Sequence, residues 1–419
     1  MKKILMIFVM ALAALTGRAQ VVCDTVLNRV QTTPFTFAVP VAGGNYRVTV
    51  TLGNKKKAGQ TVVRAESRRH YFDVVTTKKG QFTDLTFTVN KHSPLIDKKA
   101  ADGKLQEKAQ HFTQGEVTLV RNVRLKPREL SYLNWDDSLN LSFCGPVPAV
   151  QRIKIEAAPA ASPVGPTTVF LCGNSTVVDQ ENEPWASWGQ MITRWFDDRV
   201  VIANYAESGL SATTFLAQLR LDKILTQLRK GDYVICEFGH NDEKEKKAGD
   251  GAWYSYSRNL KTFVDRVRAK GGNIIFVTPT ARRFFEADQK TLRNTHGDYP
   301  EAMRTVARRE NVPVIELNGM TTTLYETLGY EGSKKALVHY PANTFANQPE
   351  ALADNTHFNP YGAWQVAKCI VMGLKQMHSP LVEHLRTDWQ DYNPNQPDNP
   401  DTFVWYPSGN TNLTKPDGN

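Results

Sequence analysis

The chain has 419 residues, of which 41% are hydrophobic and 22% charged, an ordinary composition for a soluble globular protein with room for two domains. After a short N-terminal run, no apolar stretch reaches the roughly 18 residues of a membrane span, and no basic run indicates binding to nucleic acid. The formal net charge of +9 becomes +6 without Lys2, Lys3 and Arg18. This mild excess fits an acidic polymer as substrate, but it fits a merely soluble surface equally well.

The first nineteen residues have the pattern of a secretory signal peptide. Lys2 and Lys3 precede the apolar run ILMIFVMALAAL, and the small residues Gly17 and Ala19 follow it. The mature chain is therefore expected to begin at or near Gln20 and to be secreted or periplasmic.

Residues 20–156 are predicted to form an all-β domain. Short runs with period-two alternation follow one another between Gly, Asn and Lys turns: FTFAV, YRVTVTL, QTVVRAES, YFDVVTT, DLTFTVN, EVTLVRNVRL, LNLSFCG and VQRIKIEAA. Their spacing favours a β-sandwich or jelly roll. Two questions stay open. Cys23 and Cys144 either pair in an oxidising compartment or remain thiols, and Tyr132 and Trp135 either stack on a sugar or pack at the sandwich end.

A change of pattern marks a second domain. Residues 157–166, AAPAASPVGP, are predicted to be a linker because they are rich in Ala and Pro and carry no charge. From 167 to 386, the apolar strands TTVF, RVVIANYA, DYVICEFG, NIIFVTPT and VPVIEL alternate with amphipathic helices. This alternation predicts an α/β fold with a three-layer, doubly wound parallel sheet. The Pro- and Asn-rich segment 387–419 is expected to wrap the surface or to be disordered.

Ligands of such sheets bind at the carboxyl ends of the strands, and several polar residues fall at those ends. Ser175, Gly209 and Asn241 follow the first three strands, and Asp354 with His357 comes just before the last helix. A nucleophilic serine needs a base and an acid that orients it, so His357 and Asp354 are the candidates for these roles. The backbone N–H groups of Ser175 and Gly209 and the Asn241 amide are candidate oxyanion donors.

Taken in order, the blocks GNS at 173–175, Gly209, GHND at 239–242 and DNTH at 354–357 resemble those of the SGNH, or GDSL-type, hydrolase superfamily. FGHND and DNTHFNPYGA are most similar to rhamnogalacturonan acetylesterases of carbohydrate esterase family twelve. The resemblance covers about residues 166 to 385. It implies a flavodoxin-like fold, Ser175 as nucleophile, His357 as base with Asp354 as its partner, and an oxyanion hole of Ser175, Gly209 and Asn241.

The same resemblance implies removal of acetyl groups from galacturonate in the pectin backbone without a metal. In one departure, Asn174 stands where the family usually has Asp, which should spare the chemistry but change the hydrogen bonds of the loop. The N-terminal domain resembles galactose-binding-like modules found beside bacterial polysaccharide esterases.

Three further residues are candidates for substrate contacts: His240, Asp242 and Trp185. His240 could instead brace Asn241, and Trp185, like Trp188, could pack in the core. No histidine pair has the spacing of a helical zinc site and no Gly-rich phosphate loop is present, so neither a metal nor a cofactor is predicted.

The predicted function is that of a secreted serine esterase that deacetylates an acidic plant polysaccharide, acetylated pectin, through an acetyl-Ser175 intermediate. The basic run KEKK at 244–247 either attracts the carboxylates of this substrate or is a solvated loop. One alternative is an esterase that acts on xylan or small acyl esters with the same machinery. Another is a carbohydrate-binding protein whose catalytic site has decayed. No nucleic-acid partner and no membrane insertion are expected.

Overall fold

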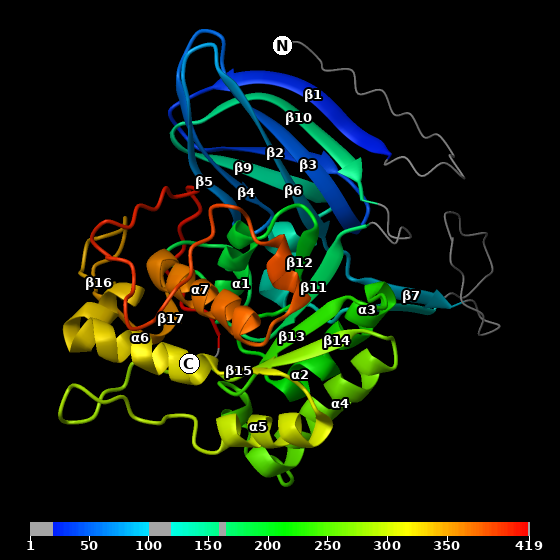
Figure 1. Cartoon of the computed structure of the whole chain (residues 1–419), viewed down its shortest axis with the longest axis vertical. Helices are drawn as coiled ribbons and strands as arrows, with labels where there is room; N and C mark the ends of the chain where they lie inside the picture. The colour runs from blue at the N-terminus through cyan, green and yellow to red at the C-terminus, as the bar shows by residue number, and fades with distance from the viewer. Residues whose placement is uncertain (1–19, 100–118, 159–164, 418–419) are drawn as a thin grey trace.

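The computed structural model describes residues 20–99, 119–158 and 165–417 (Figure 1). The predicted signal peptide and residues 159–164 of the predicted linker lie outside this part of the chain. Among the described residues, no helix combines the length and apolar character needed to cross a membrane.

Two four-stranded antiparallel sheets form the N-terminal part, as the period-two alternation predicted. Their strand orders are β1-β10-β3-β6 and β2-β9-β4-β5. Inward-facing residues of both sheets, such as Val50, Phe87, Leu141 and Ile153, are fully or almost fully buried between them. The bounds are β1 (Val21–Val30), β2 (Phe35–Pro40), β3 (Gly44–Gly53), β4 (Gly59–Ala65), β5 (Arg69–Thr77), β6 (Phe82–Lys91), β9 (Ser138–Val147) and β10 (Ala149–Ala157).

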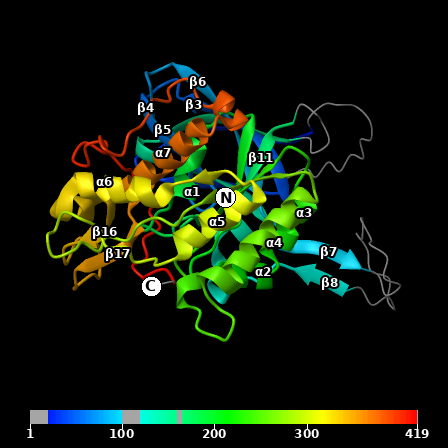
Figure 2. The same ribbon diagram turned by 60° about the horizontal axis from the view of Figure 1, so that its bottom comes forward.

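The sequence analysis missed two strands. β1 is a largely exposed edge strand whose apolar residues do not alternate strictly with polar ones, so its period-two signal is weak. β7 (Leu95–Lys99) pairs with β8 (Leu119–Asn122) in a separate two-stranded arm that projects beside α3 (Figure 2).

Both open questions about the sandwich have structural answers. All five cysteines are free thiols, so Cys23 and Cys144 do not pair. Trp135 is half-buried and packs against the rings of His92 and Tyr205, with centroids 5.0 and 6.0 Å away. Trp135 therefore joins the sandwich to the second domain rather than forming an exposed sugar platform.

The second part is built on a five-stranded, wholly parallel sheet with the order β12-β11-β13-β14-β15. This confirms the predicted doubly wound sheet and places the order reversal beside β11. The bounds are β11 (Thr167–Cys172), β12 (Val200–Asn204), β13 (Tyr233–Glu237), β14 (Asn273–Val277) and β15 (Val314–Ile315).

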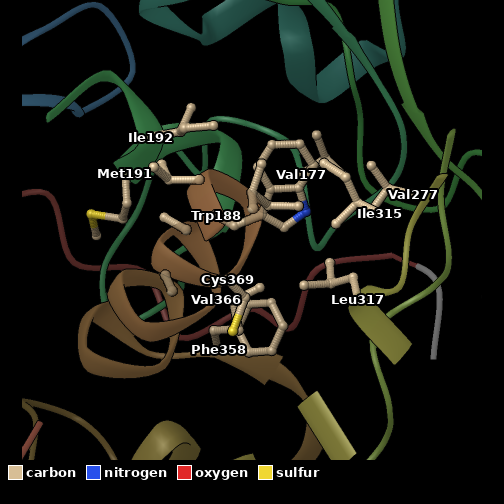
Figure 3. Packing of buried hydrophobic residues seen from close by; sticks show 14 of the residues in the cluster. Val177, Trp188, Met191, Ile192, Val277, Ile315, Leu317, Phe358, Val366 and Cys369 are labelled. Carbon is tan, nitrogen blue, oxygen red and sulfur yellow. The ribbon is translucent and has the colours of Figure 1, made fainter. Parts of the chain in front are cut away.

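Successive residues of a strand point to opposite faces of the sheet and pack in two separate cores, so the domain has three layers. Val169, Leu171 and Ile235 face α1 (Trp188–Met191), α6 (Leu317–Gly332) and α7 (Pro360–Gln376), and Figure 3 shows Trp188, Leu317 and Val366 meeting in this core. Phe170 and Val234 face the opposite layer, which consists of α2 (Ala212–Ala217), α3 (Arg220–Gln227), α4 (Ser257–Arg268) and α5 (Tyr299–Glu310).

Short elements complete the domain. β16 (Leu337–Tyr340) and β17 (Leu352–Phe358) form a two-stranded antiparallel sheet. Single turns of helix occur at η1 (Pro127–Ser131), η2 (Leu133–Trp135), η3 (Ile192–Trp195), η4 (Asp242–Lys244), η5 (Ala252–Tyr256), η6 (Ser333–Ala336) and η7 (Pro380–His384).

Residues 387–417 wrap the surface, which decides between the two hypotheses for this segment over its described length. Phe403 and Trp405 pack against the core of the α/β domain. The Glu183 carboxylate accepts hydrogen bonds from the Trp405 indole and from the backbone N–H of Ser408, at 3.0 Å each.

Candidate active site

A continuous hydrogen-bonded chain joins Ser175, His357 and Asp354. Ser175 lies in the loop after β11, whereas Asp354 and His357 lie on β17. The Ser175 Oγ is 2.8 Å from Nε2 of His357, and Nδ1 of the same ring is 2.8 Å from Oδ2 of Asp354. All three side chains belong to buried residues. The fold thus brings together the three residues that were predicted to form a triad.

The surroundings of Asp354 keep it ionised. Burial raises the pKa of this carboxyl, but the His357 ring and the backbone N–H groups of Thr356 and His357 outweigh burial and hold it well below its usual range. An ionised carboxylate only accepts hydrogen bonds, so Nδ1 of His357 carries the proton. The remaining nitrogen, Nε2, then faces the Ser175 hydroxyl as an acceptor, which is the arrangement that a general base needs.

Hydrogen bonds tie the three strand-end loops to one another. The Glu207 N–H donates to the Gly173 carbonyl at 3.2 Å, and the Asn241 side-chain amide donates to the Leu210 carbonyl at 3.0 Å. Gly209 has a φ of +77°, a conformation that favours glycine. A primary amide has two N–H donors, and among the described residues only Leu210 accepts from Asn241. The second N–H of Asn241 is therefore available to a substrate oxygen.

The structure corrects the prediction for Asp242. Its two carboxylate oxygens accept from the backbone N–H groups of Ala212 at 2.8 Å and Gly239 at 2.9 Å, and burial raises its pKa to about 7. Asp242 therefore ties the loop after β13 to the start of α2, and it has no oxygen directed at a substrate.

His240 and Trp185 are both buried close to the triad. The His240 ring packs against His296 with centroids 4.5 Å apart, and burial lowers the pKa of His240 well below its usual value. This favours the bracing hypothesis for His240. Trp185 stands edge-on to the His357 ring, 5.8 Å away between centroids, and its indole N–H donates to the Asn412 carbonyl at 3.1 Å. Trp185 therefore packs against the imidazole ring of His357.

Lys244, the first residue of the KEKK run, donates to the side-chain amide oxygen of Asn241 at 3.2 Å. Lys246 instead donates to the backbone of Glu243. Lys244 therefore lies at the site, whereas Lys246 stabilises the loop to which it belongs.

Sequence reasoning missed Glu237, a fully buried acid at the end of β13. Its carboxyl oxygens bind the Thr176 hydroxyl at 2.8 Å, the Trp188 indole and the Thr280 N–H, and burial raises its pKa to about 7. The sequence indicates it only as a single acidic residue at the end of an apolar strand. Glu237 fixes the turn directly below Ser175.

Asn174 caps the same turn. Its Oδ1 accepts from the backbone N–H and the hydroxyl of Thr176, at 3.0 and 2.9 Å. Its Nδ2 is buried and has no partner among the described residues. The departure from Asp thus keeps the acceptor that shapes the turn and adds a donor that the loop does not use.

The sandwich supports the loop that carries Ser175, which sequence analysis also missed. The turn between β4 and β5 inserts against this loop: Arg68 donates to the carbonyls of Gln180 at 3.1 Å and Trp185 at 2.9 Å. The Gln180 amide in turn donates to the Ser175 carbonyl at 2.9 Å. Arg69 pairs with Asp179 at 2.5 Å, and both side chains are fully buried. No local pattern could reveal the contacts of Arg68 and Arg69, because they join residues more than 100 positions apart.

A Ser–His–Asp chain beside the carboxyl edge of a doubly wound sheet, with the serine in the loop after a parallel strand, is the arrangement of a serine hydrolase of the α/β class. Residues 171–365 match the model of the GDSL-like Lipase/Acylhydrolase family. Over 222 residues, 52% of this chain and 94% of the relative, the identity to the rhamnogalacturonan acetylesterase RhgT of Bacillus subtilis strain 168 is 38%. This chain belongs to the GDSL-like lipase/acylhydrolase family and is a carboxylic ester hydrolase, as the motif blocks predicted.

Two other proteins are similar to this chain. The probable rhamnogalacturonan acetylesterase YesY of Bacillus subtilis strain 168 is 29% identical over 222 residues, which are 52% of this chain and 96% of the relative. The crystal structure of YxiM from Bacillus subtilis is 23% identical with a TM-score of 0.47, and the match covers 82% of this chain and 81% of that one.

Proposed function

We propose that this protein is a serine esterase that removes acetyl groups from an acidic plant polysaccharide of the rhamnogalacturonan type. One observation carries the proposal: the buried hydrogen-bonded chain Ser175–His357–Asp354, in a domain 38% identical to a rhamnogalacturonan acetylesterase. We also propose that the chain is secreted or periplasmic, that residues 20–156 and 167–386 are separate domains, and that the first is galactose-binding-like.

In the proposed mechanism, His357 Nε2 accepts the Ser175 proton while Oγ attacks the acetyl carbonyl. Negative charge develops on the carbonyl oxygen, and the N–H groups of Ser175, Gly209 and Asn241 stabilise it. The imidazolium then protonates the sugar oxygen as its bond to the acetyl carbon breaks, which releases the sugar hydroxyl and leaves an acetyl-Ser175 ester. Water, deprotonated by His357, releases acetate by the reverse sequence, and Asp354 stabilises the imidazolium at each step.

Replacing Asn241 with alanine tests the oxyanion donor. We expect kcat on p-nitrophenyl acetate to fall by about 10²–10³, because one preorganised donor is lost, while KM changes little. Circular dichroism and thermal unfolding check that the loss of the bond to Leu210 leaves the fold intact. A kcat within threefold of wild type in a folded variant would remove Asn241 from the oxyanion hole.

Acetate release from a matched set of polymers tests the substrate. We expect the highest kcat/KM on acetylated rhamnogalacturonan, a lower value on acetylated xylan, and no release from alkali-deacetylated pectin. A preference for acetylated xylan would favour the alternative substrate class on the same machinery. Failure of a fluorophosphonate probe to label Ser175 would contradict the serine mechanism for every substrate.

A further inference from the structure

Two cationic side chains reach the edge of the active site from the segment between β8 and β9. Lys126 precedes η1 and Arg128 lies within it. Lys126 Nζ donates to the Ser208 carbonyl at 2.6 Å, and Arg128 Nη2 donates to the same oxygen at 2.9 Å. A Cβ placed on Gly209 would lie 3.1 Å from Lys126 Nζ. The ammonium group therefore stands beside the backbone of the proposed oxyanion donor.

These two cations already hold a carboxylate. Lys126 Nζ is 3.2 Å from Oδ2 of Asp417, and Arg128 Nη1 is 2.9 Å from Oδ1, so each oxygen has its own cation. The cationic side chains are 21% and 27% exposed, which leaves the pair reachable from solvent but partly shielded from it. The Asp417 Cβ would lie 2.8 Å from a Cβ on Gly209. A carboxylate thus binds next to the proposed reaction centre.

Asp417 arrives there because its segment crosses the whole site. The Asn412 carbonyl accepts from Trp185, Lys415 Nζ lies 3.5 Å from Oδ2 of Asp354, and Asp417 reaches Gly209. Residues 412–417 form no helix or strand, and most are exposed. A segment held by so few backbone hydrogen bonds opens at low cost in free energy.

We propose that Lys126 and Arg128 form a carboxylate-binding subsite that takes a uronate carboxylate of the substrate and that Asp417 fills in this structure. The inference rests on the proposed function for the uronate polymer. In an acetylated uronate, the carboxylate and the acetyl ester share one sugar ring, so a cation pair beside Gly209 suits both groups at once. Substrate binding then displaces the segment 412–417, and the subsite selects acidic over neutral acetylated sugars.

The test is the binding of unacetylated trigalacturonate, measured by isothermal titration calorimetry in low-salt buffer on the full chain. Lys126→Gln is expected to raise Kd about five- to tenfold through loss of a charge-assisted hydrogen bond, and Lys126→Arg to keep Kd near the wild-type value. Asp417→Asn is expected to lower Kd severalfold because it weakens the internal competitor.

Lys261→Gln, which removes an exposed charge from α4, is the matched control. Lys126 is chosen for substitution rather than Arg128, because Arg128 also binds the buried Glu207. Replacing Arg128 would therefore disturb the loop that carries Glu207.

Three results would overturn the subsite: no binding by the wild-type protein, a Kd that neither Lys126→Gln nor Asp417→Asn changes, or equal binding of sodium acetate at the same carboxylate concentration. The assay needs no turnover, so it separates this inference from the proposed function. Trigalacturonate binding that depends on Lys126, together with no acetate release from acetylated rhamnogalacturonan, would refute the proposed substrate and leave the subsite standing.

Discussion

Replacing Ser175 with alanine is expected to lower kcat on p-nitrophenyl acetate by about 10⁴–10⁶, the range for loss of a nucleophile from a Ser–His–Asp constellation. The Ser175 Oγ is the only atom of the proposed triad that bonds to the acyl carbon. The melting temperature should change little, because the hydrogen bond that is lost is the one between the hydroxyl and the His357 ring. A variant that keeps the wild-type rate would show that another group is the nucleophile.

The two partner residues supply matched comparisons. His357→Ala should cost about as much as Ser175→Ala, because nucleophile and base act as a unit. Asp354→Asn should cost less, because an imidazole still held between Trp185 and Ser175 keeps part of its function. Equal losses in the two variants would contradict an orienting role for Asp354.

Replacing Arg69 with alanine is expected to reduce the free energy of unfolding by about 3–5 kcal/mol, because it leaves a buried carboxylate on Asp179 without its cation. Arg69 also donates to the carbonyl of Asn90, so it joins the sandwich to the loop that carries Ser175. We therefore expect kcat to fall as well. Urea unfolding followed by tryptophan fluorescence measures the first effect, and turnover of p-nitrophenyl acetate measures the second.

Arg152→Ala is the matched control for this prediction. Arg152 makes an equally short pair with Asp24, at 2.6 Å, but on the solvent-exposed face of the same domain. An exposed pair contributes little to stability, so the unfolding midpoint should not change measurably. If Arg69→Ala and Arg152→Ala behaved alike, the contact between the sandwich and the catalytic loop would not be a structural support.

Local sequence patterns did not reveal the pair of β16 and β17, but they were sufficient for the parallel sheet of the α/β domain. Its strands are apolar along their whole length because both faces are buried, and that signal needs no knowledge of neighbours in space. Ser175, Gly209 and Asn241 could be selected for a related reason: the carboxyl ends of parallel strands meet at one edge of the sheet. Asp354 and His357 instead lie on β17 of an antiparallel pair, and they were selected by their spacing just before the last helix. The prediction that Asp242 contacts the substrate was wrong, because the sequence does not reveal that this side chain turns toward backbone N–H groups.

What the sequence by itself determined is the alternation of strands and helices that builds the parallel sheet, the edge at which the site lies, and the residue types that meet there. Only the tertiary structure decided that the sandwich turn at Arg68 and Arg69 supports the nucleophile loop, that Glu237 lies beneath it, and that Asp417 reaches Gly209. The physical reason is the distance along the chain over which each kind of information acts. Periodicity reports the burial of a segment along its own axis, whereas a hydrogen bond or ion pair between distant segments depends on how whole domains pack and leaves no repeat in the chain.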